Sequence, residues 1–243
     1  MVTILHTNDF HHRLNEAQAD RLRQLRESVE GRGLLVDAGD AVGSGNVTFR
    51  AGGEPIHDLM NHAKYDVGVV GNREFHFSRI GFHTKLSRAD FPVLCANIRS
   101  VGDNALPVVP HCVFTVSGVK ILFVGLTVPM ITERMLSRKV SSFVFAEPIK
   151  TAMHIVPRLR EETQADVVIA LTHIGLKQDR LLAERVLGID LIIGGHSHDI
   201  LPDGERIGSC LVVQTGSYAQ NVGKVEITRA GAQFEMKASL EAL

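Results

Sequence analysis

The chain has 243 residues, of which 44% are hydrophobic and 22% are charged, a balance that is typical of globular domains and excludes a disordered chain. Its 26 basic and 27 acidic side chains give a net charge of −1, so no basic field is available to bind a nucleic acid polymer. Aromatic residues make up only 5% and none is Trp, which argues against a stacking platform for single strands.

The cysteines and the first residues indicate a compartment. The three cysteines, Cys95, Cys112 and Cys210, are far apart and do not form a disulfide framework, which favours a reducing environment. A polar cluster at residues 6–9 stands where a signal peptide would have its apolar stretch, and no apolar run approaches the ~20 residues that span a bilayer. We therefore expect a cytoplasmic protein without a membrane partner. The sequence does not indicate an oligomeric state.

Short apolar runs predict strands that alternate with helices. In chain order, the predicted strands are 2–5, 34–36, 67–70, 93–94, 121–126, 167–171 and 191–193. These runs are continuous, as in strands that are buried on both faces. Apolar residues at helical spacing predict helices around 22–29, 149–159 and 181–187. The second of these helices has Met153 on its apolar face and a proline at Pro157 that should kink it.

Two segments predict antiparallel pairing. Ser117-Gly118 lies between the apolar runs 113–116 and 119–126 and is a two-residue hairpin signal. The tail contains predicted strands at 211–214 and 222–228, with a further strand after Ala230-Gly231. The sequence therefore predicts an α/β protein with mixed sheets in one domain, because no linker or internal repeat interrupts it.

Polar side chains follow five of the predicted strands directly. In chain order they are Asp9, His11, Asp40, Asn72, His173, His196 and His198. The carboxyl ends of strands form the ligand-binding crevice of open α/β sheets. These oxygen and nitrogen donors include no thiolate and suit divalent ions such as Mn, Zn, Fe or Co. Seven donors exceed the needs of one tetrahedral ion, so we predict two ions that share a carboxylate.

Each of these residues also has an ordinary structural interpretation. Asp9, Asp40 and Asn72 precede expected helices, and Asp and Asn are favoured helix N-caps. A lone histidine is more often a core or surface residue than a ligand. The convergence of both residue types at five strand ends favours the metal site.

These residues lie in motifs whose order resembles the calcineurin-like metallophosphoesterase superfamily, most closely the N-terminal catalytic domain of the 5′-nucleotidase family. The motifs are His6-Thr7-Asn8-Asp9-Phe10-His11, Asp37-Ala38-Gly39-Asp40, Gly71-Asn72 followed by Glu74-Phe75, Cys95-Ala96-Asn97-Ile98, Leu171-Thr172-His173 and Gly194-Gly195-His196-Ser197-His198. Each motif alone is a weak signal, whereas the ordered set is specific and spans most of the chain.

The resemblance implies a four-layer α/β/β/α sandwich of two mixed sheets flanked by helices. The implied ligands are Asp9, His11 and His198 for one ion, Asn72, His173 and His196 for a second ion, and Asp40 as the bridge between them. Two such ions ~3.5–4 Å apart hold a phosphate and activate a bridging hydroxide for in-line attack.

The sequence departs from the family pattern in two ways. The family has a His directly after the metal-binding Asn and an Asp three residues further on, where this chain has Arg73 and His76. The 5′-nucleotidase branch usually carries a C-terminal substrate domain, and this chain ends at Leu243. We therefore expect residues 1–243 to form a single metallophosphoesterase domain without that substrate domain.

The residues at the altered motif have predicted roles. An arginine cannot give up its proton but can bind phosphate bidentately, so we assign Arg73 to phosphate binding. His76 or an ordered water would then protonate the leaving group, with packing of His76 as the alternative. Asn97 is expected to contact substrate or, alternatively, to be a turn residue. Arg13 is expected to face solvent, with a substrate contact as its alternative.

We therefore expect a metal-dependent phosphatase, a phosphoric ester hydrolase acting on a small phosphorylated metabolite or nucleotide. One alternative is a phosphodiesterase acting on cyclic nucleotides or other diesters. A second is a metal-binding or ligand-binding module with little hydrolytic activity, because Arg73 replaces the usual His. With few aromatic residues, hydrolysis should depend weakly on the nucleobase, unless Phe10 or Phe75 stacks on it.

Overall fold

Alternate residues of the central strands face two different apolar cores, which explains the continuous apolar runs. In β7 (Val119–Thr127), Ile121 and Phe123 lie in a core between two sheets, while Leu122 and Val124 lie in another core under helices. The computed structural model describes residues 1–102, 105–231 and 233–243. Every residue of β7 except Lys120 is buried, so both faces of this strand are covered.

Two six-stranded sheets build the centre of the molecule. The first has the order β14 (Gln233–Ala242), β13 (Asn221–Ala230), β1 (Val2–Thr7), β2 (Gly33–Asp37), β3 (Val67–Val69) and β4 (Val93–Leu94). The second has the order β11 (Glu205–Ile207), β12 (Cys210–Val213), β10 (Leu191–Ile193), β9 (Val167–His173), β7 and β6 (His111–Val116). A small sheet pairs β5 (Ile98–Ser100) with β8 (Phe143–Phe145).

Both large sheets are mixed. The strands β1 to β4 are parallel to one another, and β13 and β14 continue that sheet antiparallel. In the second sheet β7, β9, β10 and β12 are parallel, with antiparallel edges at β6 and β11. The hairpin predicted at Ser117-Gly118 is confirmed as the β6–β7 connection, and the strand predicted after Ala230-Gly231 is confirmed as β14, which pairs antiparallel with β13.

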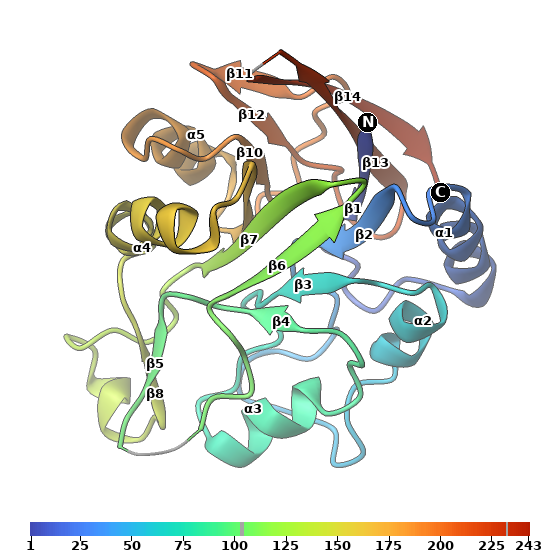
Figure 1. Cartoon of the computed structure of the whole chain (residues 1–243). Coiled ribbons are helices and arrows are strands. Elements are labelled where there is room, and N and C mark those ends of the chain that lie inside the picture. Colours follow the sequence, from blue (N-terminus) through green and yellow to red (C-terminus); the bar gives the residue numbers. More distant parts are fainter. Residues whose placement is uncertain (103–104, 232) are drawn as a thin grey trace.

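Helices cover the two outer faces (Figure 1). The helices are α1 (Glu16–Ser28), α2 (Ile56–His62), α3 (Arg79–Leu86), α4 (Pro148–Thr163) and α5 (Leu176–Arg185), with a 3₁₀ turn at Leu136–Lys139. Side chains of α1, α2 and α3 share a core with the first sheet, and those of α4 and α5 share a core with the second. The predicted four-layer fold class is confirmed.

The helix predictions needed three corrections. Met153 was placed on the buried face of α4 but is 52% exposed, and Leu187 lies beyond the end of α5 and is 85% exposed. The helix α4 continues through Pro157, which is exposed, and the kink predicted there stays a prediction. The short helices α2 and α3 were not predicted, because seven and eight residues are too few to establish a helical period.

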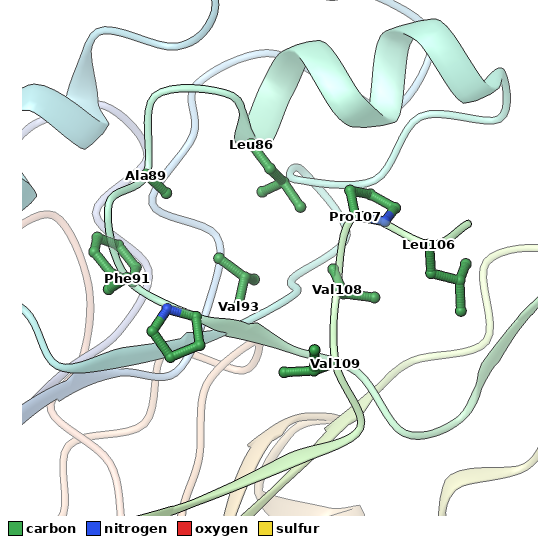
Figure 2. A pocket seen from close by; sticks show the side chains of 9 residues that line it. Leu86, Ala89, Phe91, Val93, Leu106, Pro107, Val108 and Val109 are labelled. Carbon is green, nitrogen blue, oxygen red and sulfur yellow. The ribbon is translucent and has the colours of Figure 1, made fainter.

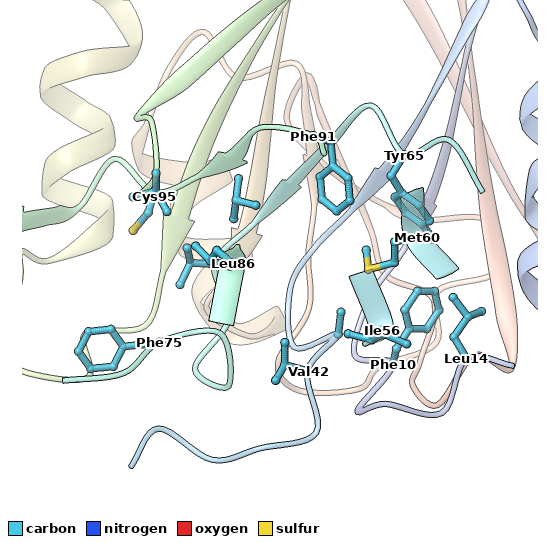
Figure 3. Packing of buried hydrophobic residues seen from close by; sticks show 14 of the residues in the cluster. Phe10, Leu14, Val42, Ile56, Met60, Tyr65, Phe75, Leu86, Phe91 and Cys95 are labelled. Carbon is cyan, nitrogen blue, oxygen red and sulfur yellow. The ribbon is translucent and has the colours of Figure 1, made fainter. Parts of the chain in front are cut away.

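The core under α1, α2 and α3 contains the two phenylalanines that had been considered for base stacking. Phe10 is fully buried near Leu14 and Ile56 (Figure 3). Phe75 is also buried and packs edge to face on Phe145, with ring centroids 5.0 Å apart. Because both rings are inside the protein, neither is available to a nucleobase.

An apolar hollow of about 300 Å³ lies between the end of α3 and the segment 106–109. Leu86, Phe91, Val93 and Pro107 line it (Figure 2), and none of the seven candidate ligands does. In the described parts of the chain, no helix is long and apolar enough to cross a membrane.

Candidate metal centre and active site

The carboxyl ends of β1, β2, β3, β9 and β10 meet where the two sheets face each other, and the seven candidate ligands lie there. Backbone hydrogen bonds continue the β1–β2 pairing past both strands, from Asp9 N to Gly39 O (2.9 Å) and from His11 N to Asp40 O (2.9 Å). This continuation sets Asp9 and Asp40 side by side. His173 is the last residue of β9 and faces them from the second sheet.

Three ligand atoms converge in a group that we call the outer triad: Asp9, His11 and His198. The Nε2 atoms of His198 and His11 lie 3.1 Å and 3.4 Å from Asp9 Oδ1. The two Nε2 atoms are 3.0 Å apart. Asp9 is buried, the His11 side chain is only 10% exposed, and the His198 side chain is 34% exposed.

A second group, the inner triad, consists of Asp9, Asp40 and His173, all buried. Nε2 of His173 is 3.5 Å from Asp40 Oδ1 and 4.0 Å from Asp9 Oδ1. Nδ1 of His173 donates to the carbonyl of Ala38 at 2.8 Å. In this tautomer Nε2 carries no hydrogen, and its lone pair faces the carboxylates of Asp40 and Asp9. This buried Nε2 has no hydrogen-bond partner among the described residues, as expected of a metal ligand.

The last two candidate ligands adjoin the inner triad. Nδ1 of His196 is 3.0 Å from Oδ1 of Asn72, and the His196 ring centroid is 5.1 Å from that of His173. The backbone N–H of His196 donates to Asp9 Oδ2 at 2.8 Å. The structure therefore brings all seven predicted ligands into one cluster, and their individual roles as ligands stay predictions.

The electrostatics of the cluster favour a bound cation. Burial would lower the pKa of His173, but the carboxylates of Asp40 and Asp9 outweigh it and raise that pKa to about 9. Burial would raise the pKa of Asp9, yet hydrogen bonding from His11 and the charge of His173 hold it below its usual value. Without a cation the site thus attracts a proton, so the residues present fit divalent metal ions.

The alternative that these side chains are helix N-caps is wrong. The N-cap of α1 is Asn15, whose side chain accepts a hydrogen bond from Gln18 N at 2.9 Å. The N-cap of α3 is Ser78, and α2 begins after Pro55. The segments after Asp9, Asp40 and Asn72 are turns or loops, so none of the three caps a helix.

Five of the candidate ligands have left-handed backbone conformations, which are uncommon for residues other than glycine. Their φ angles are 55° for Asp9, 48° for His11, 54° for Asp40, 79° for His196 and 59° for His198. Such conformations cost about 1–3 kcal/mol each and persist where the surrounding structure enforces them, most often at functional sites. This concentration of strain supports a functional role for the cluster.

Two glycines allow the backbone to come this close. A Cβ on Gly71 would lie 2.3 Å from Asp40 Oδ1, and a Cβ on Gly195 would lie 2.7 Å from the carbonyl of Ala38. Any side chain at either position would displace a ligand or the strand end that carries it.

Glu74 is a structural element of the site that the sequence analysis included only as part of a motif. Its buried carboxylate accepts backbone N–H groups of Gly71 (2.8 Å), Asp40 (2.9 Å) and Val42 (3.0 Å). Burial, together with the nearby Asp40 carboxylate, raises the pKa of Glu74. Glu74 thereby fixes the loops after β2 and β3 to each other.

Arg73 lies at the rim of the inner triad. Its backbone N–H donates to Asp40 Oδ1 at 2.7 Å, and its Nη1 donates to the carbonyl of Gly43 at 2.8 Å. The guanidinium Nε is 3.6 Å from Asp40 Oδ2, and the side chain is partly exposed. This position is compatible with the predicted contact to phosphate, which stays a prediction.

The geometry does not support a catalytic role for His76. The side chain is buried, its ring stacks on Phe77 with centroids 4.7 Å apart, and its Nδ1 accepts the backbone N–H of Ser78 at 3.0 Å. Phe49 packs against the ring edge, with centroids 5.1 Å apart. These contacts correspond to the packing alternative.

The side chain of Asn97 likewise makes structural hydrogen bonds. Its amide nitrogen donates to the carbonyls of Thr127 (2.8 Å) and Ala146 (3.1 Å), and its Oδ1 accepts Thr127 N–H at 3.0 Å. The side chain is buried and joins the end of β7 to the start of α4. Because both amide hydrogens are used, the predicted contact of Asn97 with substrate is not supported.

The two-sheet fold and a cluster of carboxylates and histidines define a class of metal-dependent hydrolases. A family model for calcineurin-like phosphoesterases matches residues 2–199, and the chain belongs to this family. Membership confirms the predicted class of enzyme, since the family is hydrolytic and uses divalent metals.

Several similar proteins are named as nucleotidases or nucleotide phosphoesterases. The trifunctional nucleotide phosphoesterase YfkN of Bacillus subtilis is 31% identical over 93% of this chain and 18% of its own length. Human 5′-nucleotidase is 32% identical over 84% of this chain and 39% of its own length. A 5′-nucleotidase precursor from Thermus thermophilus superimposes with a TM-score of 0.78 at 24% identity, covering 99% of this chain and 54% of that one.

The chain thus spans less than half the length of these curated relatives. The expectation that residues 1–243 act as a single domain without a substrate domain stays a prediction.

Proposed function

We propose that this chain is a dinuclear-metal phosphoesterase that hydrolyses a small phosphorylated metabolite or nucleotide. The observation that carries the proposal is the overlap of the inner and outer triads on one buried carboxylate, Asp9. A single ion in the inner triad would leave Nε2 of His11 and Nε2 of His198, which also converge on Asp9 Oδ1, without a metal ion.

In this proposal the outer triad holds one ion, and Asp40, His173, Asn72 and His196 hold the other. Bound in this way, the two ions would polarise the phosphate and lower the pKa of a water for in-line attack. The family pattern assigns the bridge to Asp40, whereas Asp9 belongs to both triads. Both carboxylates are therefore candidates for the shared ligand.

Two further steps, binding of the phosphate and protonation of the leaving group, do not need a metal ligand. The guanidinium of Arg73 contacts a phosphate oxygen and stabilises charge that builds on the phosphoryl group. His76 is buried with Nδ1 in use as an acceptor, so solvent rather than His76 supplies the proton to the leaving group. Hydrolysis should then depend strongly on the acidity of the leaving group.

The named relatives make nucleotides reasonable substrates. Phe10 and Phe75 are buried, so we expect less than a ~100-fold preference for one nucleobase, which corresponds to about 2.7 kcal/mol of transition-state binding.

The test is elemental analysis of the purified chain after supplementation with Mn, Zn, Co or Fe, followed by a screen of phosphomonoesters, phosphodiesters and nucleotides. About two ions per chain together with turnover of monoesters supports the proposal. One ion or fewer contradicts the dinuclear centre. Preferred turnover of cyclic nucleotides or other diesters supports the phosphodiesterase alternative, and two ions without any turnover support a binding module.

A further inference from the structure

An exposed tyrosine stands beside the outer triad. The ring of Tyr218 is 5.4 Å from the ring of His11 and 5.7 Å from that of His198, measured between centroids. Its backbone N–H donates to the carbonyl of Asp9 at 2.8 Å, and its φ is 61°. A bulky side chain in this conformation is an outlier, so the structure holds this ring at the metal cluster against a backbone cost. The side chain is 42% exposed and is accessible to a ligand.

An arginine, Arg13, stacks on this tyrosine. The Cζ atom of Arg13 lies 4.9 Å from the centroid of the Tyr218 ring. Within the part of the chain that the structure describes, Arg13 forms no ion pair, whereas Arg26 pairs with Asp66 and Arg180 pairs with Glu205. Stacking fixes the plane of the guanidinium while leaving its N–H edge free for an anionic acceptor.

The position of this pair relative to the metal cluster indicates which part of a substrate it meets. The phosphoryl group of an ester would lie at the ions and at Arg73, next to the inner triad. Tyr218 lies beside His11 and His198 of the outer triad, and Arg13 stacks on Tyr218. What extends over them is therefore the organic part of the ester.

We propose that Arg13, held flat on Tyr218, binds a second anionic group on the leaving group, so that the site prefers esters whose leaving group carries a carboxylate or a further phosphate. This inference rests on the proposed phosphoesterase function. A planar guanidinium binds either group through two parallel hydrogen bonds.

The test uses two aryl phosphates of nearly the same shape, 4-carboxyphenyl phosphate and 4-carbamoylphenyl phosphate, which differ in the charge of the para group. The quantity measured is the ratio of their kcat/KM values with the Mn²⁺-loaded protein. We expect Arg13→Gln to lower this ratio about tenfold, the size of one lost charge-assisted interaction. Arg185→Gln is the matched control, because Arg185 is exposed in the last turn of α5, and it should leave the ratio unchanged.

Two substitutions of the tyrosine separate its ring from its hydroxyl. Tyr218→Phe keeps the stacking surface and should retain the wild-type ratio, whereas Tyr218→Leu should lower it several-fold. An equal loss of kcat/KM for both esters in Tyr218→Leu, with no change in the ratio, would mean that the ring binds aromatic groups regardless of charge and would contradict the proposal.

A binding measurement distinguishes failure of this inference from failure of the proposed function. Titration calorimetry with (4-carboxybenzyl)phosphonate and its carbamoyl analogue gives the ratio of their two Kd values. This ratio reports the same preference for the charged group and does not require turnover. If wild type hydrolyses both esters and Arg13→Gln changes neither ratio, this inference is overturned and the phosphoesterase remains. If wild type hydrolyses neither ester but Arg13→Gln changes the Kd ratio, the hydrolytic function is overturned and the anion site remains.

Discussion

The inner and outer triads share Asp9 but differ in burial and in what holds them. Asp40 and His173 are buried next to Asp9, and hydrogen bonds to Glu74 and Ala38 fix their surroundings. His198 is partly exposed and His11 is largely buried, and both rings lie next to Tyr218, on which Arg13 stacks.

The candidate metal centre therefore combines a fully buried triad with a triad that is closer to solvent. In the inner triad His173 is the last residue of β9, so sheet register positions it, whereas Asp9 and Asp40 lie in loops and have the same left-handed backbone as the outer histidines. We expect the inner ion to exchange slowly and the outer ion to exchange readily, because buried ligands must move before an ion can leave.

The largest effect should come from removing the carboxylate on which the triads overlap. Asp9→Ala should lower the metal content at both sites and reduce hydrolysis by roughly 10³-fold or more, since metal stabilisation of the transition state is worth several kcal/mol. Elemental analysis and kcat/KM measure the two effects.

Asp40→Ala is the companion variant, because the family pattern makes Asp40 the bridge. If Asp40 is the shared ligand, its removal should empty both sites. Retention of about one ion by Asp40→Ala, with none retained by Asp9→Ala, would instead assign the bridge to Asp9.

A smaller effect should follow from removing an outer histidine. His198→Ala should leave about one ion per chain, because the inner triad and its neighbours remain intact. His154→Ala is the matched control, since His154 is exposed on α4 away from the cluster. Loss of both ions in His198→Ala would contradict the independence of the two halves.

The support beneath the inner triad should have a smaller effect still. A glutamine at position 74 can accept fewer of the three N–H groups that Glu74 now accepts, so Glu74→Gln should weaken metal affinity by about 10- to 100-fold. The loss should be confined to the more tightly bound ion. A metal titration monitored by calorimetry resolves the affinities of the two ions. An equal loss of affinity for both ions would show that Glu74 supports the whole cluster.

The sequence predicted that the candidate ligands would cluster, because they follow buried strands whose ends meet at one edge. Asp9, Asp40 and His173 were found in this way. The apolar runs predicted the central strands for the same reason, since burial on both faces leaves a local signal.

What the sequence did not predict depends on contacts between distant segments. For His76 the sequence left a role at the leaving group and packing as alternatives, and the contact with Phe49 from a separate loop, which favours packing, has no local signature. Arg13 was expected to face solvent, and it does so while stacked on Tyr218, more than two hundred positions along the chain. The left-handed backbone of the ligands is likewise enforced by long-range packing.

The smallest expected effect on metal content belongs to the two residues of the altered catalytic motif, Arg73 and His76, neither of which is a candidate ligand. Arg73→Ala should lower kcat/KM about ten- to hundredfold for aryl and alkyl phosphates alike, because it removes a charge-assisted contact with the phosphoryl group.

His76→Ala should leave the ratio of aryl to alkyl rates unchanged, because the buried ring accepts the backbone N–H of Ser78 and packs on Phe77 rather than protonating the leaving group. A series of esters with leaving groups of graded acidity, with metal content checked in each variant, measures both effects. A selective loss of alkyl-ester hydrolysis in His76→Ala would restore His76 as the general acid. A silent Arg73→Ala would remove the phosphate contact from the mechanism. Arg73→His restores the family residue without its usual Asp partner, so it should recover alkyl-ester hydrolysis only in part.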